Sequence, residues 1–282
     1  MEKNNQPLVS IVIPCYNHEQ FVQDCIQSVI DQTYENIELI IIDDGSKDNS
    51  VLKIQEMVRK CQNRFKRFEF RYRPNKGLSA TLNEAIDWCC GEYFSVIASD
   101  DMMISYKTDL QIKVFQNNSD ILGVFGNILL INDKGEKIKS PIIKERDYVF
   151  ADVYRQNYYL PAPTQMLKMV EIRKVGGFID GMIIEDWYIY LKLLENGGKM
   201  YLLKENLCFY RYHCNNTSGN FKKMVLGRFQ VINQFSSNKA TDDIFIKQCW
   251  DNAFYTVKLS FWKSIKIMIK SFFSNLRKII YK

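Results

Sequence analysis

The most constraining feature of this sequence is a pair of short, almost wholly apolar segments near its start. Residues 8–13 read Leu-Val-Ser-Ile-Val-Ile, and residues 37–42 read Ile-Glu-Leu-Ile-Ile-Ile. Such β-branched runs are too short for helices and are typical of buried parallel strands. Between them, apolar residues from Phe21 to Ile30 recur every three or four positions, as one face of an amphipathic helix requires. The three segments predict a βαβ unit.

The same alternation continues through the first hundred residues. We expect a helix from about Ser50, a strand over residues 68–72, a helix over 78–89 and a strand over 93–98. Strands that alternate with helices predict a doubly wound α/β fold with a mainly parallel sheet. In such folds the ligand crevice lies at the carboxyl ends of the strands, so the active site is sought there.

The second half of the chain has a less regular pattern. Beyond residue 104 we expect a helix through Leu110 and Val114, a strand over 123–131, a hairpin turn at 132–135, a helix over 185–196, and two short strands at 199–203 and 207–212. These segments predict a compact unit without internal repeats.

Charge sets the last part of the chain apart from the rest. The chain carries a net charge of +6, and the seven Lys and Arg that follow Asp251, with no Asp or Glu among them, account for all of it. Drawn on a helix, residues 261–282 place apolar side chains on one side and lysines on another. This pattern favours a basic amphipathic helix lying on an anionic membrane surface. A terminal helix docked on the body, or a contact between two copies, is the alternative.

Composition excludes several classes of protein. With 46% hydrophobic residues, the chain can bury a full-sized core and is not intrinsically disordered as a whole. Its eight cysteines contain no Cys-x-x-Cys pair, which argues against a zinc site or a disulfide framework. We see no span long enough to cross a bilayer and no signal peptide. The expected location is the cytoplasm, peripherally attached to the inner face of the cell membrane.

Paired acids follow two of the predicted parallel strands. Asp43 and Asp44 follow the second strand, and Asp100 and Asp101 follow the fourth. Four carboxylates at one edge of a sheet repel one another unless they bind a ligand or share a cation. Capping of the next helix is the ordinary alternative for either pair alone. Both pairs together favour a divalent cation that also meets substrate phosphates, as Mg²⁺ commonly does.

Four motifs occur in an order that resembles the family 2 glycosyltransferases, which have the GT-A fold. They are Val-Ser-Ile-Val-Ile-Pro-Cys-Tyr-Asn at 9–17, Asp-Asp-Gly-Ser at 43–46, Lys-Gly-Leu-Ser-Ala at 76–80 with Asn83, and Ser-Asp-Asp at 99–101. The resemblance continues through Gly-Gly-Phe at 176–178, Glu-Asp-Trp at 185–187 and Tyr-Arg-Tyr-His at 210–213. It covers roughly residues 8–218.

The resemblance implies a set of donor-binding residues. For the nucleotide these are Pro14, Tyr16, Asn17, Asp44, Lys76 and Asp100, with Asp44 accepting from the base and Asp100 from the ribose. Asp101 and His213 would hold Mg²⁺ or Mn²⁺. Family members often carry a further acid where this chain has Ala98, which predicts weaker metal binding. Core packing is the alternative for Tyr16, and a solvated surface lysine is the alternative for Lys76.

The resemblance also implies the catalytic base and the acceptor side. Asp186 would deprotonate the acceptor hydroxyl, with Glu185 and Trp187 beside it on the acceptor side. Capping of a helix by two acids in its first turn is the alternative for Asp186 and Glu185. His18 is expected to face solvent, and residues 216–218 to form a loop that closes over the donor.

Together these expectations describe an inverting, metal-dependent enzyme of bacterial surface-polysaccharide synthesis. It would transfer a hexosyl or N-acetylhexosaminyl group from a nucleoside-diphosphate sugar, a UDP-sugar by preference, to a glycan or a polyprenyl-diphosphate-linked sugar, without a nucleic-acid partner. We assign residues 1–104 to a nucleotide-sugar-binding half, 105–220 to an acceptor-binding half, and 221–282 to a helical basic tail.

A sugar-1-phosphate nucleotidyltransferase and a non-catalytic sugar-nucleotide-binding protein are the alternatives. The first lacks support because no Gly-rich basic loop follows the first strand. The second is disfavoured because the acidic pair at 185 and 186 is present.

Overall fold

A computed structural model describes residues 6–138, 140–141, 143–213 and 221–235 of the chain. The chain divides into two compact units, Met1–Gly219 and Asn220–Lys282. In the second unit the described element is helix α8 (Phe221–Gln234). The basic helix expected at 261–282 and the closing loop expected at 216–218 lie outside the described residues.

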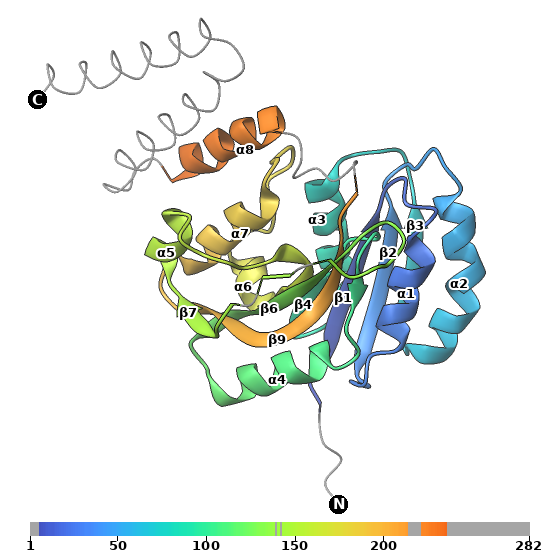
Figure 1. The fold of residues 1–282 in the computed structure, drawn as a ribbon, viewed down its shortest axis with the longest axis horizontal. Helices are drawn as coiled ribbons and strands as arrows, with labels where there is room; N and C mark the ends of the chain where they lie inside the picture. The colour runs from blue at the N-terminus through green and yellow to red at the C-terminus, as the bar shows by residue number, and fades with distance from the viewer. Residues whose placement is uncertain (1–5, 139, 142, 214–220, 236–282) are drawn as a thin grey trace, which may run out of the picture. The chain divides into compact units, whose positions relative to one another are not determined.

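The first four strands form the parallel part of the sheet. They are β1 (Val9–Cys15), β2 (Ile37–Asp43), β3 (Phe68–Tyr72) and β4 (Tyr93–Val96). They lie in the order β3-β2-β1-β4, with every neighbouring pair parallel (Figure 1). The parallel α/β arrangement predicted from the sequence is therefore confirmed, and β1, β2 and β4 end at one edge of the sheet.

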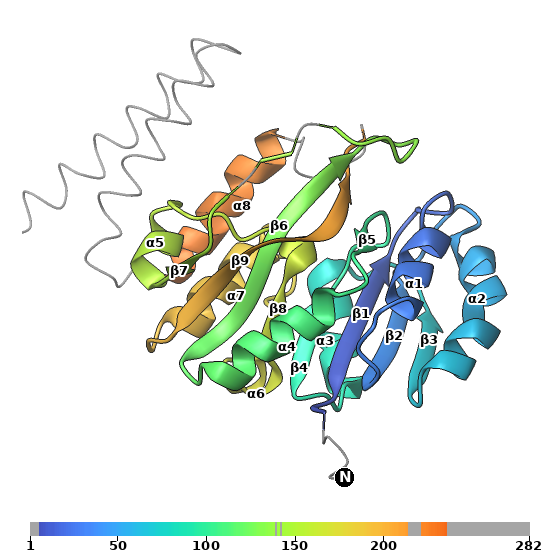
Figure 2. The same ribbon diagram turned by 60° about the horizontal axis from the view of Figure 1, so that its bottom comes forward.

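Helices cover both faces of this parallel part. Alternate residues of β1, among them Ile11 and Ile13, belong to one apolar core with the buried sides of α1 (Val22–Ile30) and α2 (Ser50–Arg64). Helix α3 (Leu78–Trp88) lies on the opposite face (Figures 1 and 2). Because β1 and β2 are buried on both faces, their sequences are apolar almost throughout.

The second half of the unit extends the sheet with mixed pairing. Strand β4 pairs antiparallel with β8 (Met166–Lys168), β8 antiparallel with β6 (Ile121–Ile131), and β6 parallel with β9 (Lys199–Arg211). Strands β5 (Met102–Met103) and β7 (Arg146–Tyr148) both pair antiparallel with β9, which completes a 9-stranded sheet. The remaining elements are helices α4 (Lys107–Asn117), α5 (Phe150–Tyr154), α6 (Met169–Lys174) and α7 (Glu185–Leu194), and the short 3₁₀ helix η1 (Ala162–Thr164).

Strand β9 differs from the sequence-based expectation of two short strands. The expected break between 203 and 207 does not occur, because the chain continues as one strand with register shifts against β6 around Asn127. The Asn127 side chain donates to the Lys204 carbonyl at 2.8 Å and so satisfies the backbone at the irregularity. Gly126 permits the close approach, because a Cβ there would lie 2.4 Å from the Leu207 side chain. The hairpin turn at 132–135 is confirmed by the hydrogen bond from Gly135 N to Asn132 O.

Among the described residues, every helix is too short or too polar to cross a lipid bilayer.

Candidate active site at the carboxyl ends of the strands

The loops that follow β1 and β2 are joined by Asn17. Its backbone N–H donates to Ser46 Oγ at 2.8 Å, and its side-chain Oδ1 accepts from Lys47 N at 2.7 Å. Asn17 adopts a left-handed φ of 56°, which asparagine tolerates better than most residues. Tyr16, just before this turn, is 46% exposed, so it is not the core residue that the alternative interpretation required. Pro14 is half-buried at the end of β1.

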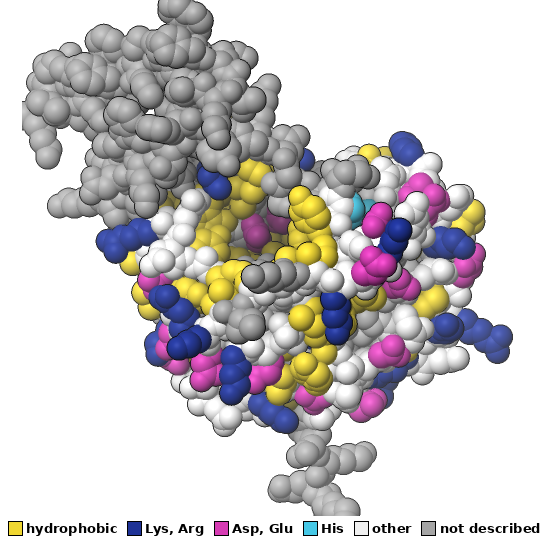
Figure 3. Space-filling view, viewed as in Figure 1, with side chains coloured by type: hydrophobic (Ala, Val, Ile, Leu, Met, Phe, Trp, Pro, Cys, Tyr) yellow, Lys and Arg dark blue, Asp and Glu magenta, His cyan; other side chains and the backbone are white. Residues whose placement is uncertain are grey.

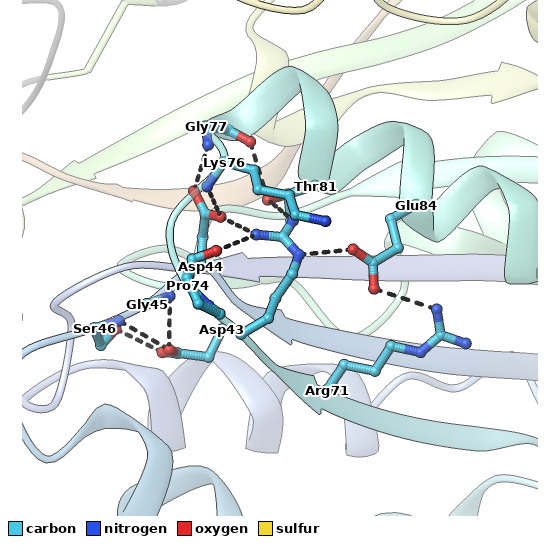
Figure 4. Close-up of polar contacts among 11 residues, drawn as sticks. Asp43, Asp44, Gly45, Ser46, Arg71, Pro74, Lys76, Gly77, Thr81 and Glu84 are labelled. Atoms are coloured by element: carbon cyan, nitrogen blue, oxygen red, sulfur yellow. Dashed lines mark hydrogen bonds and ion pairs between the residues drawn. The ribbon is translucent and has the colours of Figure 1, made fainter.

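The two carboxylates after β2 have different partners. Asp43 accepts from the backbone N–H groups of Gly45 and Ser46 at 3.1 and 2.9 Å, and from Ser46 Oγ at 2.5 Å. It therefore stabilises its own loop and does not cap the next helix, since α2 begins at Ser50 and has no side-chain cap. Asp44, the next residue, points to the loop that follows β3 (Figure 4).

Asp44 is held by a ring of donors. Its Oδ1 accepts from Arg73 Nη1 and from Lys76 N, and its Oδ2 accepts from Gly77 N at 2.9 Å. The two loops can meet because Gly45 has no side chain, since a Cβ there would lie 2.6 Å from Asn75 N. Asp44 is 5% exposed and is fixed in one orientation. Lys76 contributes its backbone N–H to this ring, while its side chain is exposed.

Arg73 is a site residue that the sequence analysis missed. Its guanidinium bridges Asp44 and Glu84 of α3, with 2.7 Å between Nε and Glu84 Oε2, and also donates to Thr81 Oγ1 at 2.9 Å (Figure 4). Although burial acts in the opposite direction, hydrogen bonds from Arg73 and then Arg71 lower the pKa of Glu84. The one available signal in the sequence was that Arg73 directly follows β3 and Asp44 directly follows β2, and these strands were expected in the same parallel sheet.

Asp100 lies between the two histidines of the chain. Its Oδ2 is 2.9 Å from His213 Nε2 and 3.8 Å from His18 Nε2. One potential ligand atom from each of these three residues lies within 4.8 Å of the others. In the space-filling view a histidine reaches the surface beside acidic side chains (Figure 3). The side chains of Asp100 and His213 are 11% and 9% exposed.

His18 is placed differently from the sequence-based expectation. Its side chain is 23% exposed rather than solvent-facing, and its Nδ1 lies 2.8 Å from the buried Ser99 Oγ. Burial lowers the pKa of His18, against the opposing effect of Asp100. The left-handed turn at Asn17 and the hydrogen bond from His18 N to Ser50 Oγ direct the chain inward at this point.

Asp101 is also placed differently from its expected metal-binding position. It is 2% exposed, and its Oδ1 accepts the backbone N–H of Arg211 at 2.8 Å. Burial, and then the neighbouring Asp100, raise the pKa of Asp101 well above its ordinary value. Thus the structure brings Asp100 rather than Asp101 next to His213, and Asp101 joins the loop after β4 to the end of β9.

Phe21 packs among the charged groups of this cluster. The Arg211 guanidinium lies 4.6 Å from the centre of the Phe21 ring, and the His213 ring stacks on Phe21 with centroids 5.5 Å apart. Arg211 Nε donates to the Asp100 carbonyl at 3.0 Å. These contacts limit the freedom of His213 and of the loop that carries Asp100.

The acidic pair at 185 and 186 begins helix α7. Asp186 Oδ1 accepts from Trp187 N at 2.7 Å, and burial raises the pKa of Asp186. Trp187 was expected on the acceptor side, but it is 1% exposed and its indole N–H donates to the Val153 carbonyl at 3.0 Å. Trp187 therefore fixes the start of α7 against α5. Glu185 is half-buried beside Asp186.

The donor set around Asp100 suits a divalent cation. Two imidazoles and one carboxylate can approach a common point, and a carboxylate with neutral imidazoles is a usual ligand set for such ions. A separate groove of about 440 Å³ lies between α4 and β9 and is lined by residues such as Leu110, Val114 and Tyr201. It includes none of the residues that the sequence motifs indicated.

The fold and this row of acidic loops define a transferase of the GT-A class. The chain belongs to glycosyl transferase family 2, whose model matches residues 10–175, more than half of the sequence. The GT-A fold expected from the sequence is also found in solved structures of Staphylococcus aureus TarS. The complex of TarS residues 1–349 with UDP-GlcNAc superposes with a TM-score of 0.64 at 16% identity, over 84% of this chain and 70% of that one. At this identity the likeness concerns the fold.

The relatives of this chain include bacterial and archaeal proteins. The chain is 28% identical over 233 residues to Escherichia coli WfgD, named as a UDP-Glc:alpha-D-GlcNAc-diphosphoundecaprenol beta-1,3-glucosyltransferase, over 82% of this chain and 87% of WfgD. It is 26% identical over 243 residues to an uncharacterized glycosyltransferase of Methanocaldococcus jannaschii, covering 83% and 81% of the two chains. The 29% identity to Pasteurella multocida hyaluronan synthase extends over 82% of this chain but 23% of that enzyme. Other longer relatives are likewise matched over about a fifth of their length.

Proposed function

We propose that this protein transfers a sugar from a nucleoside-diphosphate sugar to a hydroxyl of a glycan or lipid-linked glycan, with inversion at the anomeric carbon. The observation that carries the proposal is the contact between Asp100 and His213, because it joins the acidic loop after β4 to the end of β9 at the edge where β1 and β2 also end. Parallel α/β sheets bind their ligands at this edge.

The donor nucleotide is proposed to lie over the loops that follow β1 and β2. Tyr16 is exposed and offers an aromatic face for the base. The Asp44 carboxylate accepts three hydrogen bonds, from Arg73, Lys76 N and Gly77 N. Because a carboxylate can accept about four hydrogen bonds, one position remains for an N–H of the base. A pyrimidine with an N–H, such as uracil, fits this acceptor. The proposal keeps Pro14, Asn17 and Lys76 as neighbours of the nucleotide, and keeps the ribose contact assigned to Asp100.

A divalent cation, Mg²⁺ or Mn²⁺, is proposed at the edge marked by Asp100 and His213. When bound, it would neutralise the negative charge that builds up on the departing nucleoside diphosphate. Asp100 would supply an oxygen ligand and His213 a nitrogen ligand. Asp101, which the sequence assigned as a ligand, would act by holding Arg211 N and so the end of β9.

Asp186 is proposed as the base on the acceptor side. Its carboxylate would take the proton of the acceptor hydroxyl as that oxygen attacks the anomeric carbon, while the bond from this carbon to the diphosphate oxygen breaks. Displacement from the opposite side inverts the configuration. The burial of Asp186 supports this role, because a raised pKa makes the carboxylate a better proton acceptor. Glu185 is proposed to contact the acceptor.

The acceptor is proposed to be a lipid-linked sugar of surface-polysaccharide synthesis, at the inner face of the cell membrane. The name of WfgD, a glucosyltransferase for alpha-D-GlcNAc-diphosphoundecaprenol, supports this class of acceptor. The basic sequence after Asp251 supports attachment to anionic lipid. Truncation after Asp251 should release the protein from membrane fractions, and unchanged sedimentation would refute this part of the proposal. The same proposal assigns donor binding to residues 1–104, acceptor binding to 105–220 and membrane attachment to the tail, 221–282.

The whole proposal can be tested with purified full-length protein. Nucleoside-diphosphate sugars are incubated with a GlcNAc-diphosphate lipid acceptor, with and without Mn²⁺ or Mg²⁺, and product and released nucleotide are measured by mass spectrometry. We expect a disaccharide product and release of the nucleoside diphosphate, and the anomeric coupling constant gives the stereochemistry. Release of pyrophosphate from a nucleoside triphosphate and a sugar phosphate, with no transfer, would contradict the proposal.

A further inference from the structure

We propose that His18 is a metal ligand and that, with Asp100 and His213, it makes a site of two nitrogens and one carboxylate that binds Mn²⁺ in preference to Mg²⁺. This inference rests on the proposed function, because it concerns the same cation. It goes beyond the sequence motifs, in which His18 had no role.

The distances allow all three side chains to reach one ion. The candidate ligand atoms lie within 4.8 Å of one another, and Asp100 Oδ2 is 2.9 Å from His213 Nε2 and 3.8 Å from His18 Nε2. Ligand atoms that each lie about 2 Å from a metal are separated from one another by roughly 3 to 4 Å. The cluster therefore needs only small side-chain rotations to close on a cation.

His18 also has the second contact that metal-bound histidines normally show. Its Nδ1 lies 2.8 Å from Oγ of Ser99, which is 1% exposed. When Nδ1–H donates to this hydroxyl, Nε2 carries the free lone pair on the side of Asp100. The His18 ring meets the His213 ring edge-on, with an interplanar angle of 83° and centroids 6.0 Å apart, so the two nitrogens can approach an ion from different directions.

The backbone around His18 holds it in this position. The hydrogen bond from His18 N to Ser50 Oγ, at 2.9 Å, fixes the residue against the start of α2. The next residue, Glu19, donates its N–H to Asp48 Oδ2 at 3.0 Å. These two anchors limit the conformational entropy that the loop loses when a metal binds.

The chemistry of the ligands determines the preferred ion. Mg²⁺ favours oxygen ligands and keeps much of its water, whereas imidazole suits the transition ions. Asp101 does not belong to the group of ligand atoms within 4.8 Å of one another, and its Oδ1 accepts the backbone N–H of Arg211. A site with two imidazoles and one carboxylate should therefore bind Mn²⁺, Co²⁺ or Zn²⁺ more tightly than Mg²⁺.

The test measures metal binding by the full chain without sugar donor, using Mn²⁺ as the probe. Electron paramagnetic resonance gives the Mn²⁺ affinity and its competition by Mg²⁺, and electron spin echo modulation detects the nitrogens bound to Mn²⁺. We expect nitrogen coupling from two imidazoles in the wild type and from one in His18→Ala, with Mn²⁺ affinity lowered at least about tenfold. His18→Asp should restore affinity with an oxygen ligand and shift the preference toward Mg²⁺. Gln20→Ala, an exposed residue two positions along, is the control.

The outcomes separate this inference from the proposed function. If His18→Ala binds Mn²⁺ as the wild type does, with unchanged nitrogen coupling, His18 is not a ligand, while the metal dependence proposed for the enzyme stands. If Mn²⁺ binds to the wild type with coupling from one nitrogen only, the inference is likewise overturned. If Mn²⁺ fails to bind the wild type, both this inference and the proposed cation site at Asp100 fail. Circular dichroism of each variant verifies folding, and His18→Asp serves if the alanine variant does not fold.

Discussion

Asp101 and Arg211, which are 110 positions apart in the sequence, are joined by a buried hydrogen bond of 2.8 Å from the Arg211 backbone N–H to the Asp101 carboxylate. This bond holds the end of β9 against the loop after β4. Since His213 follows Arg211 by two residues and Asp100 precedes Asp101, the same bond brings the imidazole and the carboxylate of the proposed metal site together.

The first prediction separates the two adjacent aspartates. Asp101→Asn keeps an acceptor oxygen for Arg211 N, so we expect Mn²⁺ affinity close to that of the wild type. Asp101→Ala leaves a buried N–H without its partner, which should lower the free energy of unfolding by about 1–3 kcal/mol and weaken metal binding. Asp100→Asn should lose more than about tenfold in Mn²⁺ affinity without a comparable loss of stability. These are measured by isothermal titration calorimetry and urea unfolding.

The opposite result would return Asp101 to the role that the sequence motif suggested. If Asp101→Asn loses Mn²⁺ binding as fully as Asp100→Asn does, the carboxylate charge of Asp101 is required, and its hydrogen bond to Arg211 is not its main function.

The second prediction concerns Arg73. Because Arg73 orients Asp44 through an ion pair, Arg73→Ala should weaken nucleoside-diphosphate binding about five- to tenfold, roughly 1–1.4 kcal/mol. Arg71→Ala is the matched control, since Arg71 pairs with Glu69 and Glu84, whereas Arg73 pairs with Glu84 and Asp44. Both variants are compared by titration with UDP. Equal losses in the two variants would mean that the ion-pair network as a whole, and not the orientation of Asp44, supports binding.

The third prediction uses the burial of Asp186. Since burial raises its pKa above the ordinary 3.8, the carboxylate becomes protonated, and inactive as a base, at a higher pH than an exposed aspartate would. The rate of sugar transfer should therefore fall on the acid side with a midpoint above 3.8. Asp186→Asn should reduce turnover about 10² to 10⁴-fold while nucleotide binding is kept.

Glu185→Gln serves as the control for Asp186→Asn, because it removes the neighbouring charge and leaves the base. It should change the affinity for acceptor more than turnover. If Asp186→Asn turns over like the wild type, another group is the base. The same conclusion follows if the residual activity of Asp186→Asn still falls at acid pH with the wild-type midpoint.

Much of the donor half could be predicted from the sequence because its elements have strong local patterns. The apolar runs of β1 and β2 are typical of a parallel sheet covered on both faces, and the alternation of strands and helices adds β4 to the same sheet. Asp44 follows β2 and Asp100 follows β4, so both are expected at one edge. Asp43 and Asp101 could not be distinguished from their neighbours in the same way. Which carboxylate of a pair turns toward a backbone N–H depends on contacts with Ser46 or with Arg211, and the second of these is remote in sequence.

Other parts of the site depend on single backbone conformations or on distant pairing. The left-handed turn at Asn17 directs His18 toward Asp100, and a loop sequence does not reveal this direction. Arg73 acquires its role only when Gly45 lets the loop after β2 approach the loop after β3. The continuity of β9 through the polar residues at 204–206 depends on Asn127 of another strand.

The fourth prediction concerns Lys107, a fully buried lysine of α4. Its Nζ donates to Ser95 Oγ at 2.7 Å, and burial lowers its pKa from 10.5 to about 7. The unfolded chain keeps this proton up to about pH 10.5, so between pH 7 and 10.5 the unfolded state binds more protons than the folded state. The free energy of unfolding should therefore rise with pH in this range, by at most about 1.4 kcal/mol per pH unit from this group. Below pH 7 both states carry the proton, and the contribution becomes constant.

Replacing Lys107 by methionine should remove this dependence. Lys107→Met should be most stabilised relative to the wild type at pH 6, where the wild type holds a buried charge, and the difference should narrow toward pH 10. Lys113→Met changes an exposed lysine on the same helix and should follow the wild-type curve. Urea unfolding of the three proteins at several pH values measures these curves. Parallel curves for Lys107→Met and the wild type would mean that Lys107 keeps its proton in the folded state, through hydrogen bonds to Ser95 and Gln165 that outweigh the cost of burial.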